Sequence, residues 1–130
     1  MSFDLSLPLS SAEFKALRTS MGVTAAWVAG RLGVATNSVL RWERDRTPDK
    51  QAVRFLLELK MRFDGEVEWY DERAWEPDPF GRRESRFILI PRHNSDDPER
   101  MPIGWHLMVA QRVRERHPDV RVMFDDGAEA

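Results

Sequence analysis

Apolar residues recur at helical spacing near the start of the chain. The first apolar stripe consists of Phe14, Leu17 and Met21. Ser10 and Glu13 before it match a capping box, in which each residue satisfies a backbone N–H of the other. We therefore expect a helix over residues 11–21, which Gly22 would end.

Two short helices with a tight turn between them are predicted for residues 24–44. Thr24 can cap the first helix, and the second would begin near Thr36. The apolar positions where the two helices would cross are Val28, Ala29, Leu32, Val34, Val39 and Trp42. Gly33 suits a turn with positive φ, which a residue without Cβ adopts at little cost, and Val34 is expected to fill the corner.

Pro48 and Asp49 open a fourth predicted helix. Its apolar stripe consists of Val53, Leu56, Leu57 and Met61. Asp64 and Gly65 interrupt this pattern and are predicted to end the helix. Residues 1–65 are thus expected to form an N-terminal domain of four or five helices.

The second half alternates short apolar runs with polar loops. Residues 86–90 and 120–124 are predicted strands because they are rich in β-branched and aromatic side chains. Pro102 suits the first turn of a helix over residues 103–117 between them. One helix and two strands are too little to close a core, so residues 66–130 are predicted to be a small α+β dimerisation element. The expected fold class is mainly α.

The charge of the chain is unevenly distributed. The formal net charge is −2, but residues 1–63 hold ten Lys/Arg against six Asp/Glu, and residues 64–130 hold ten against sixteen. The first half therefore has a balance of +4 and the second half one of −6. A nucleic-acid contact is expected in the first half only.

Few residue patterns suggest catalysis. The chain has no cysteine, and His93, His106 and His117 lack metal-ligand spacing. We expect no catalytic residue, no metal site, no cofactor and therefore no enzyme. No apolar run approaches the roughly 20 residues of a membrane span, and the N-terminus lacks the basic start of a secretory signal. A cytoplasmic protein without membrane contact is expected.

The segment TAAWVAGRLGVATNSVLRWERDRTP, residues 24–48, closely resembles the helix-turn-helix of phage-repressor-type (XRE-like) regulators. The resemblance is carried by Ala29, Gly33, Val34, Val39, Trp42, Glu43 and Pro48. The C-terminal block, a strand followed by PIGWHLMVAQRV, makes the layout similar to that of the anti-CRISPR-associated repressors. This resemblance implies a homodimer that binds an inverted-repeat operator in double-stranded DNA and represses its own operon.

The motif implies which side chains would contact DNA. The expected base-reading residues are Thr36, Asn37, Ser38 and Arg41. The expected phosphate contacts are Arg18, Arg31, Arg44 and Arg46. Asn can bond adenine and Arg can bond guanine through two hydrogen bonds each. Glu43 is expected to fix structure through a local ion pair, and Trp27 to pack at the boundary of the core.

The second half is expected to supply the dimer contact. The predicted interface residues are Phe87, Ile88, Leu89, Ile103, Leu107 and Ala110. Two alternatives remain open. The chain could be an antitoxin whose acidic half binds a toxin protein, or an RNA-binding regulator that uses the stretch RRESRF beside Trp75 and Phe80.

Overall fold

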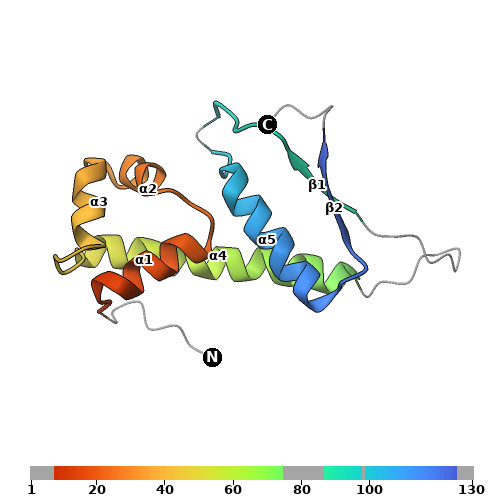
Figure 1. Cartoon of the computed structure of the whole chain (residues 1–130), viewed down its shortest axis with the longest axis horizontal. Coiled ribbons are helices and arrows are strands. Elements are labelled where there is room, and N and C mark those ends of the chain that lie inside the picture. The colour runs from red at the N-terminus through yellow and green to blue at the C-terminus, as the bar shows by residue number, and fades with distance from the viewer. Residues whose placement is uncertain (1–7, 75–86, 98, 126–130) are drawn as a thin grey trace, which may run out of the picture. The chain divides into compact units, whose positions relative to one another are not determined.

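The computed structural model describes residues 8–74, 87–97 and 99–125. Over these ranges the protein is mainly helical, with five helices and one sheet of two parallel strands (Figure 1). The chain divides into two compact units, Met1–Arg62 and Phe63–Ala130. The division falls inside one helix, between Arg62 and Phe63 rather than between Gly65 and Glu66 where the sequence pattern breaks.

The N-terminal unit contains α1 (Ser11–Ser20), α2 (Ala25–Leu32), α3 (Thr36–Trp42) and the first part of α4 (Lys50–Ala74). The predicted capping box is confirmed, because Ser10 Oγ accepts from Glu13 N at 3.1 Å and Glu13 Oε1 accepts from Ser10 N at 2.9 Å. Thr24 Oγ1 accepts from Trp27 N at 3.0 Å, which confirms the second cap. These caps decide where α1 and α2 begin.

The turn between α2 and α3 is built on Gly33, whose φ of 69° is left-handed as predicted. Gly33 N donates to Gly30 O, and Val34 N donates to Ala29 O at 3.0 Å, which is the Schellman pattern of helix ends. Val34 therefore closes the helix with its backbone, while its side chain stays 38% exposed. The prediction that Val34 fills the corner is wrong, since buried Ala29 and Val39 already close the crossing.

The core of the N-terminal unit lies under this crossing. Its fully buried side chains include Phe14, Met21, Val23, Val28, Ala29, Val39 and Leu56. Trp42 meets Phe14 edge to face with centroids 6.1 Å apart, and the ring of Trp27 lies 6.2 Å from that of Phe55. The short α3 is therefore held by packing, because no side chain caps its N-terminus.

The helix α4 does not end at Asp64 and Gly65, so that prediction is wrong. A helical glycine costs only about 1 kcal/mol relative to alanine. The turns on either side of Gly65 bury Phe63 and Val67, and this burial offsets the cost. Met61, predicted in the apolar stripe, is 49% exposed because the buried face passes through Phe63 instead.

The C-terminal unit contains the rest of α4, then β1 (Phe87–Pro91), α5 (Ile103–Arg116) and β2 (Arg121–Asp125). The two predicted strands and the helix between them are confirmed, and the strands pair in parallel from Phe87 opposite Arg121 to Pro91 opposite Asp125. Asn94 Oδ1 accepts from Ile103 N at 2.8 Å and so caps α5 from a preceding loop. None of the described helices is both long and apolar enough to cross a membrane.

The core of this unit forms where α5 packs on β1 and on the end of α4. Its buried side chains include Phe63, Val67, Ile88, Ile90, Trp105, Val109, Ala110 and Val113. Trp105 is fully buried, its ring stands edge to face on Phe63 at 5.1 Å, and its Nε1–H donates to Glu66 Oε2 at 2.8 Å. Trp105 and Val109 turn inward from α5, whereas Leu107 is 41% exposed.

Candidate nucleic-acid interface

The outward face of α3 carries the predicted base-reading residues. Thr36, Asn37 and Arg41 are exposed, and Ser38 is half-buried. Val39 on the opposite side is completely buried and anchors the helix. The structure therefore brings these polar side chains together on one solvent-facing surface of the N-terminal unit.

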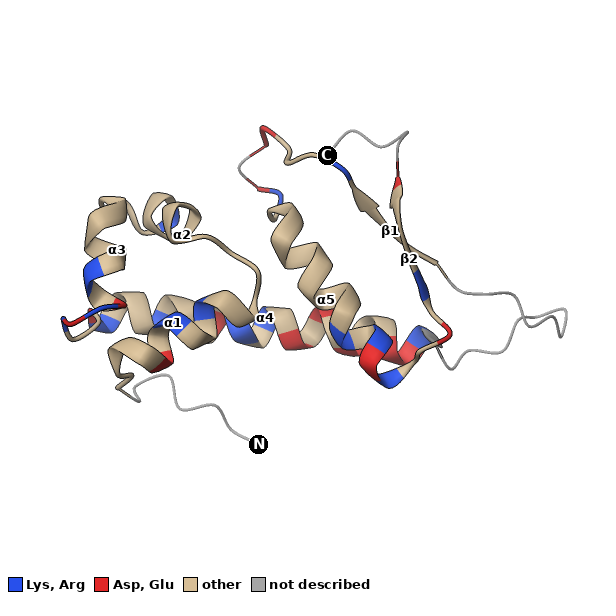
Figure 2. Ribbon diagram, viewed as in Figure 1, with Lys and Arg blue, Asp and Glu red and all other residues tan. Residues whose placement is uncertain are grey.

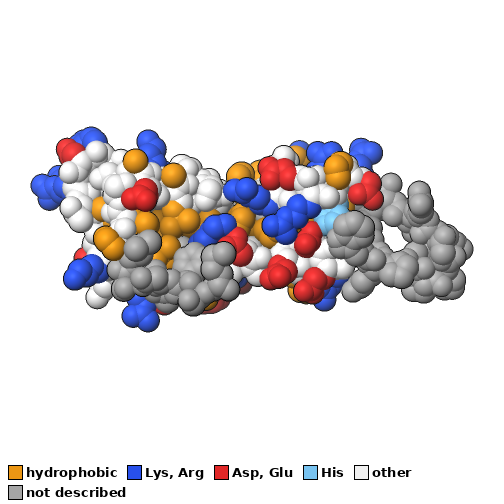
Figure 3. Space-filling model, turned by 90° about the horizontal axis from the view of Figure 1, so that it is seen from below, with side chains coloured by type: hydrophobic (Ala, Val, Ile, Leu, Met, Phe, Trp, Pro, Cys, Tyr) orange, Lys and Arg blue, Asp and Glu red, His pale blue; other side chains and the backbone are white. Residues whose placement is uncertain are grey.

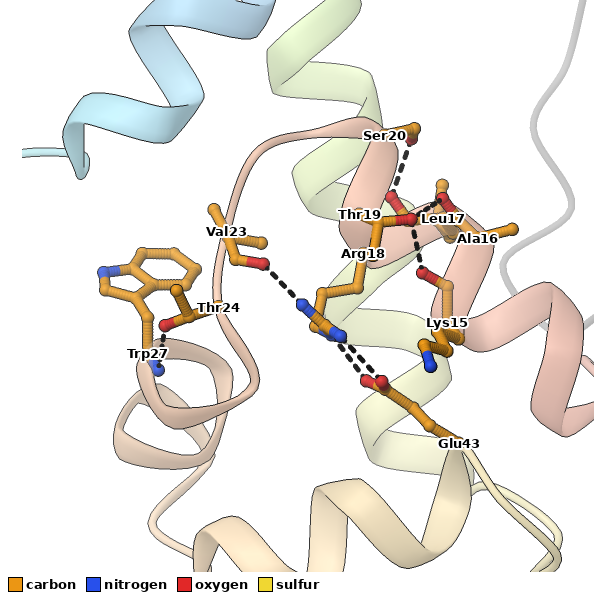
Figure 4. Close-up of polar contacts among 10 residues, drawn as sticks. All are labelled: Lys15, Ala16, Leu17, Arg18, Thr19, Ser20, Val23, Thr24, Trp27 and Glu43. Atoms are coloured by element: carbon orange, nitrogen blue, oxygen red, sulfur yellow. Dashed lines mark hydrogen bonds and ion pairs between the residues drawn. The ribbon is translucent and has the colours of Figure 1, made fainter.

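Arg18 does not belong to that surface (Figure 4). Its Nε and Nη2 donate to Glu43 Oε2 and Oε1 at 2.5 and 2.7 Å, and its Nη1 donates to Val23 O at 2.9 Å. The two side chains are only 12% and 4% exposed. The prediction that Arg18 contacts phosphate is corrected here, because every nitrogen of its guanidinium is bound inside the unit. The predicted structural role of Glu43 is confirmed, since this pair joins α1 to the end of α3.

The other three predicted phosphate residues lie at the surface. Arg31 is exposed, and its guanidinium lies 5.1 Å from the centroid of the Trp27 ring. Arg44 is 72% exposed and pairs at 3.3 Å with Asp45, which is 62% exposed, so the contact has little strength in water. Arg46 is exposed in the loop after α3, where Figure 2 shows basic and acidic residues next to each other.

Leu40 is a surface residue of α3 that the sequence reasoning missed. Its side chain is 46% exposed between buried Val39 and exposed Arg41. Helical spacing places it beside Thr36 and Asn37, four and three positions earlier, rather than beside the core. The sequence did contain a signal for this exposure. Since Val39 faces the core, the adjacent Leu40 lies about 100° away around the helix, toward the surface.

The predicted dimer residues of the C-terminal unit are divided between surface and core. Phe87 and Leu89 are each 58% exposed, Leu107 is 41% exposed and Ile103 is half-buried. Ile88 and Ala110 are buried within the unit, so they cannot form a docking surface and are corrected here. Alternation along β1 explains the split, because successive strand residues point to opposite faces.

An open groove of about 370 Å³ lies on the C-terminal unit. It is lined by Trp69, Tyr70, Arg73, Phe87, Ile88, Val113 and Val120. Burial raises the pKa of the Tyr70 hydroxyl above its ordinary value, and the negative charge of Glu66 raises it further. The stretch considered for RNA binding comprises Trp75, Phe80 and residues 82–86, which lie outside the described residues.

His117, at the end of α5, contacts a carboxylate of α4. Its Nε2 lies 2.6 Å from Asp71 Oδ1, and Arg116 Nη1 donates to Asp71 Oδ2 at 3.4 Å. His117 is only 6% exposed. Asp71 of α4 thus binds two consecutive residues at the end of α5. Within the described ranges, no three His, Cys, Asp or Glu side chains are arranged to hold a metal ion.

The two units differ in surface character. On the face drawn in Figure 3, the N-terminal unit shows basic and a few acidic side chains around a band of hydrophobic ones, and the C-terminal unit shows side chains of both signs interspersed. The sequence matches no family model and no curated protein.

Proposed function

We propose that the protein is a DNA-binding transcriptional repressor in which α2 and α3 form a helix-turn-helix and α3 enters the major groove. The observation that carries this proposal is the outward face of α3. It exposes Asn37 and Arg41 from a helix that Val39 and the Arg18–Glu43 pair anchor from behind. The positive balance of residues 1–63 supports a polyanionic partner for this unit.

Each exposed side chain has a chemical role in this proposal. Asn37 bonds the edge of adenine and Arg41 bonds N7 and O6 of guanine, while Thr36 and Ser38 bond base edges or phosphate. Leu40 contacts the C5-methyl group of thymine, the one apolar group that the major groove offers. Arg31, Arg44 and Arg46 bind phosphates and position the helix.

The repressor acts as a homodimer on an inverted repeat and controls its own operon, which the resemblance to anti-CRISPR-associated repressors suggests is an anti-CRISPR operon. One α3 can read only a few base pairs, so two linked copies multiply the specificity. In such dimers the half-sites lie about 34 Å apart, one turn of B-DNA. The acidic C-terminal unit, with its balance of −6, supplies the protein contact rather than a DNA contact.

The experiment starts from an operator selected from a randomised duplex library with the full chain. Arg41→Ala should weaken specific binding by about 1–3 kcal/mol per half-site. Arg46→Ala should weaken binding to the operator and to a scrambled duplex alike, and should lower the salt slope by about one unit per half-site. Selection of no sequence, or equal losses on both duplexes for Arg41→Ala, would reject the proposal.

Thymine contact by Leu40 has its own test on the same operator. Replacing single thymines by deoxyuridine removes only the methyl group, so one replacement per half-site should weaken binding of the wild-type protein several-fold. The Leu40→Ala variant should bind the thymine and uracil operators equally well. A wild-type protein indifferent to every replacement would remove Leu40 from the readout but leave the rest of the proposal standing.

A further inference from the structure

One face of the two-stranded sheet of the C-terminal unit is covered over β1, although Phe124 of β2 on the same face stays 44% exposed; the other face is open over both strands. Ile88 and Ile90 are 7% and 1% exposed, on the face where α5 packs on β1. Phe87 and Leu89 alternate with them, and the parallel register places Arg121 and Met123 on the same open face. Phe87 and Leu89 are each 58% exposed and Met123 is 47% exposed. Parallel strands are normally covered on both faces, so this open face calls for a partner.

The charges on this face indicate which partner fits. Arg121 stands at one end of β2 and Asp125 at the other, with Met123 midway between them. By strand alternation all three side chains belong to the open face. Rotation by 180° about an axis across the strand at Met123 exchanges the positions of Arg121 and Asp125. The face is therefore complementary in charge to a copy of itself.

We propose that a second copy of this chain covers the open face, with the two sheets stacked about a two-fold axis that crosses the strands at Leu89 and Met123. Leu89 and Met123 of the two copies then meet at the axis, and Phe87 meets the partner's Pro91. Arg121 pairs with the partner's Asp125, and the symmetry repeats this pair on the other side. The proposal deepens the homodimer of the proposed function by naming its surface and its register.

The same charges exclude the other two-fold stacking. With the axis parallel to the strands, β1 would lie over the partner's β2 in the parallel register, and Arg121 would face Phe87 of the other copy. Both arginines would then lose water without gaining a carboxylate. The crossed arrangement buries the apolar centre and keeps the charged pairs at the rim, as stable interfaces do.

The experiment reverses the charges in the full chain and follows association by sedimentation over a range of concentrations, without DNA. Arg121→Asp and Asp125→Arg should each weaken the dimer by at least about tenfold, because each sets like charges against each other twice. The double variant Arg121→Asp with Asp125→Arg should restore it. An equimolar mixture of the two single variants should form a heterodimer, in which every pair is again opposite. Arg54→Asp, an equal charge change on an exposed residue of α4, should have no effect.

Cross-linking gives a second readout, because the chain has no cysteine. Met123→Cys should be cross-linked between copies by a short bis-maleimide, and Met61→Cys, which replaces a side chain of matching exposure, should not. A monomer at every concentration would overturn the proposal and leave the face to a different protein, such as a toxin. A dimer unaffected by the charge reversals would also overturn it. Neither outcome depends on operator binding, which is tested separately.

Discussion

The two units of this protein expose opposite kinds of surface. Around α3, the N-terminal unit exposes polar and basic side chains such as Asn37, Arg41 and Arg46, whereas the C-terminal unit exposes Phe87, Leu89 and Met123 on its sheet. The change of character occurs within α4. Residues 50–62 hold four bases and one acid, and residues 63–74 hold one base and five acids. The charge balance therefore changes sign along a single helix.

Each unit also contains a buried polar contact between segments far apart in the sequence. Arg18 and Glu43 form it in the N-terminal unit, and Asp71 and His117 form it in the C-terminal unit. The first pair is hidden from water on both sides, while Asp71 keeps 28% of its side chain exposed. A buried charge that loses its partner is destabilising because water cannot replace the lost contact. Removing one member should therefore cost more stability in the N-terminal pair than in the C-terminal one.

Glu43→Ala should produce a larger loss than removal of the Asp71–His117 contact. It leaves the Arg18 guanidinium buried without its carboxylate, which costs about 3–5 kcal/mol of unfolding free energy. Chemical denaturation of the full chain measures this loss, and amide hydrogen exchange should place it in α1–α3. Asp45→Ala, which removes an exposed partner of Arg44, should cost less than about 0.5 kcal/mol. Equal losses for the two variants would contradict the structural role of Glu43.

Asp71→Ala should destabilise the C-terminal unit by a smaller amount, about 1–3 kcal/mol, because it removes the 2.6 Å contact with the buried His117. Amide exchange should accelerate in α5 and β2 while protection in α1–α3 is kept. Glu115→Ala removes an exposed carboxylate 3.9 Å from Arg112 and serves as the control with little expected effect. Equal loss of protection in both units would contradict a stabilising role of Asp71 confined to the C-terminal unit.

Two glycines of the N-terminal unit should respond to alanine with opposite signs. At Gly33, with φ of 69°, a Cβ meets no atom within 4 Å, so Gly33→Ala costs only backbone strain, about 1–2 kcal/mol. At Gly30, inside α2, the added Cβ also meets nothing, and Gly30→Ala should stabilise by about 0.5–1 kcal/mol. Thermal melts of both variants, compared with the wild type, measure these changes in stability. A Gly33→Ala variant as stable as the wild type would refute the left-handed turn.

The smallest expected effect is spectroscopic and concerns Tyr70. The chain has a single tyrosine, so absorbance of the tyrosinate reports on this residue alone. Burial raises its pKa, so the native protein should ionise above the ordinary range near pH 10. The unfolded chain ionises first, and stability should therefore fall as the pH rises through the unfolded pKa toward the folded one. Tyr70→Phe should remove this dependence. A native midpoint no higher than that in denaturant would contradict the burial.

Local features of this protein follow from the sequence alone. The capping box of Ser10 and Glu13, the cap at Thr24, the left-handed Gly33 and the two strands around a helix were all predicted from short stretches of chain. Their causes act over a few residues, because a cap needs only one neighbouring N–H and a turn needs only one φ. The polar face of α3 belongs to the same class, since helical periodicity orients its side chains.

Tertiary structure decided the features that depend on distant partners. The guanidinium of Arg18 could bind either a phosphate or a carboxylate. Only the fold brings its Nε to 2.5 Å from Oε2 of Glu43, which lies 25 residues further along the chain. Gly65 would end an isolated helix, and α4 passes through it because Phe63 and Val67 are buried on either side. The sequence marked Phe87, Ile88 and Leu89 alike as apolar. In the structure Ile88 is buried where α5 packs on β1, whereas Phe87 and Leu89 stay exposed. Burial depends on the surrounding segments and not on the residue itself.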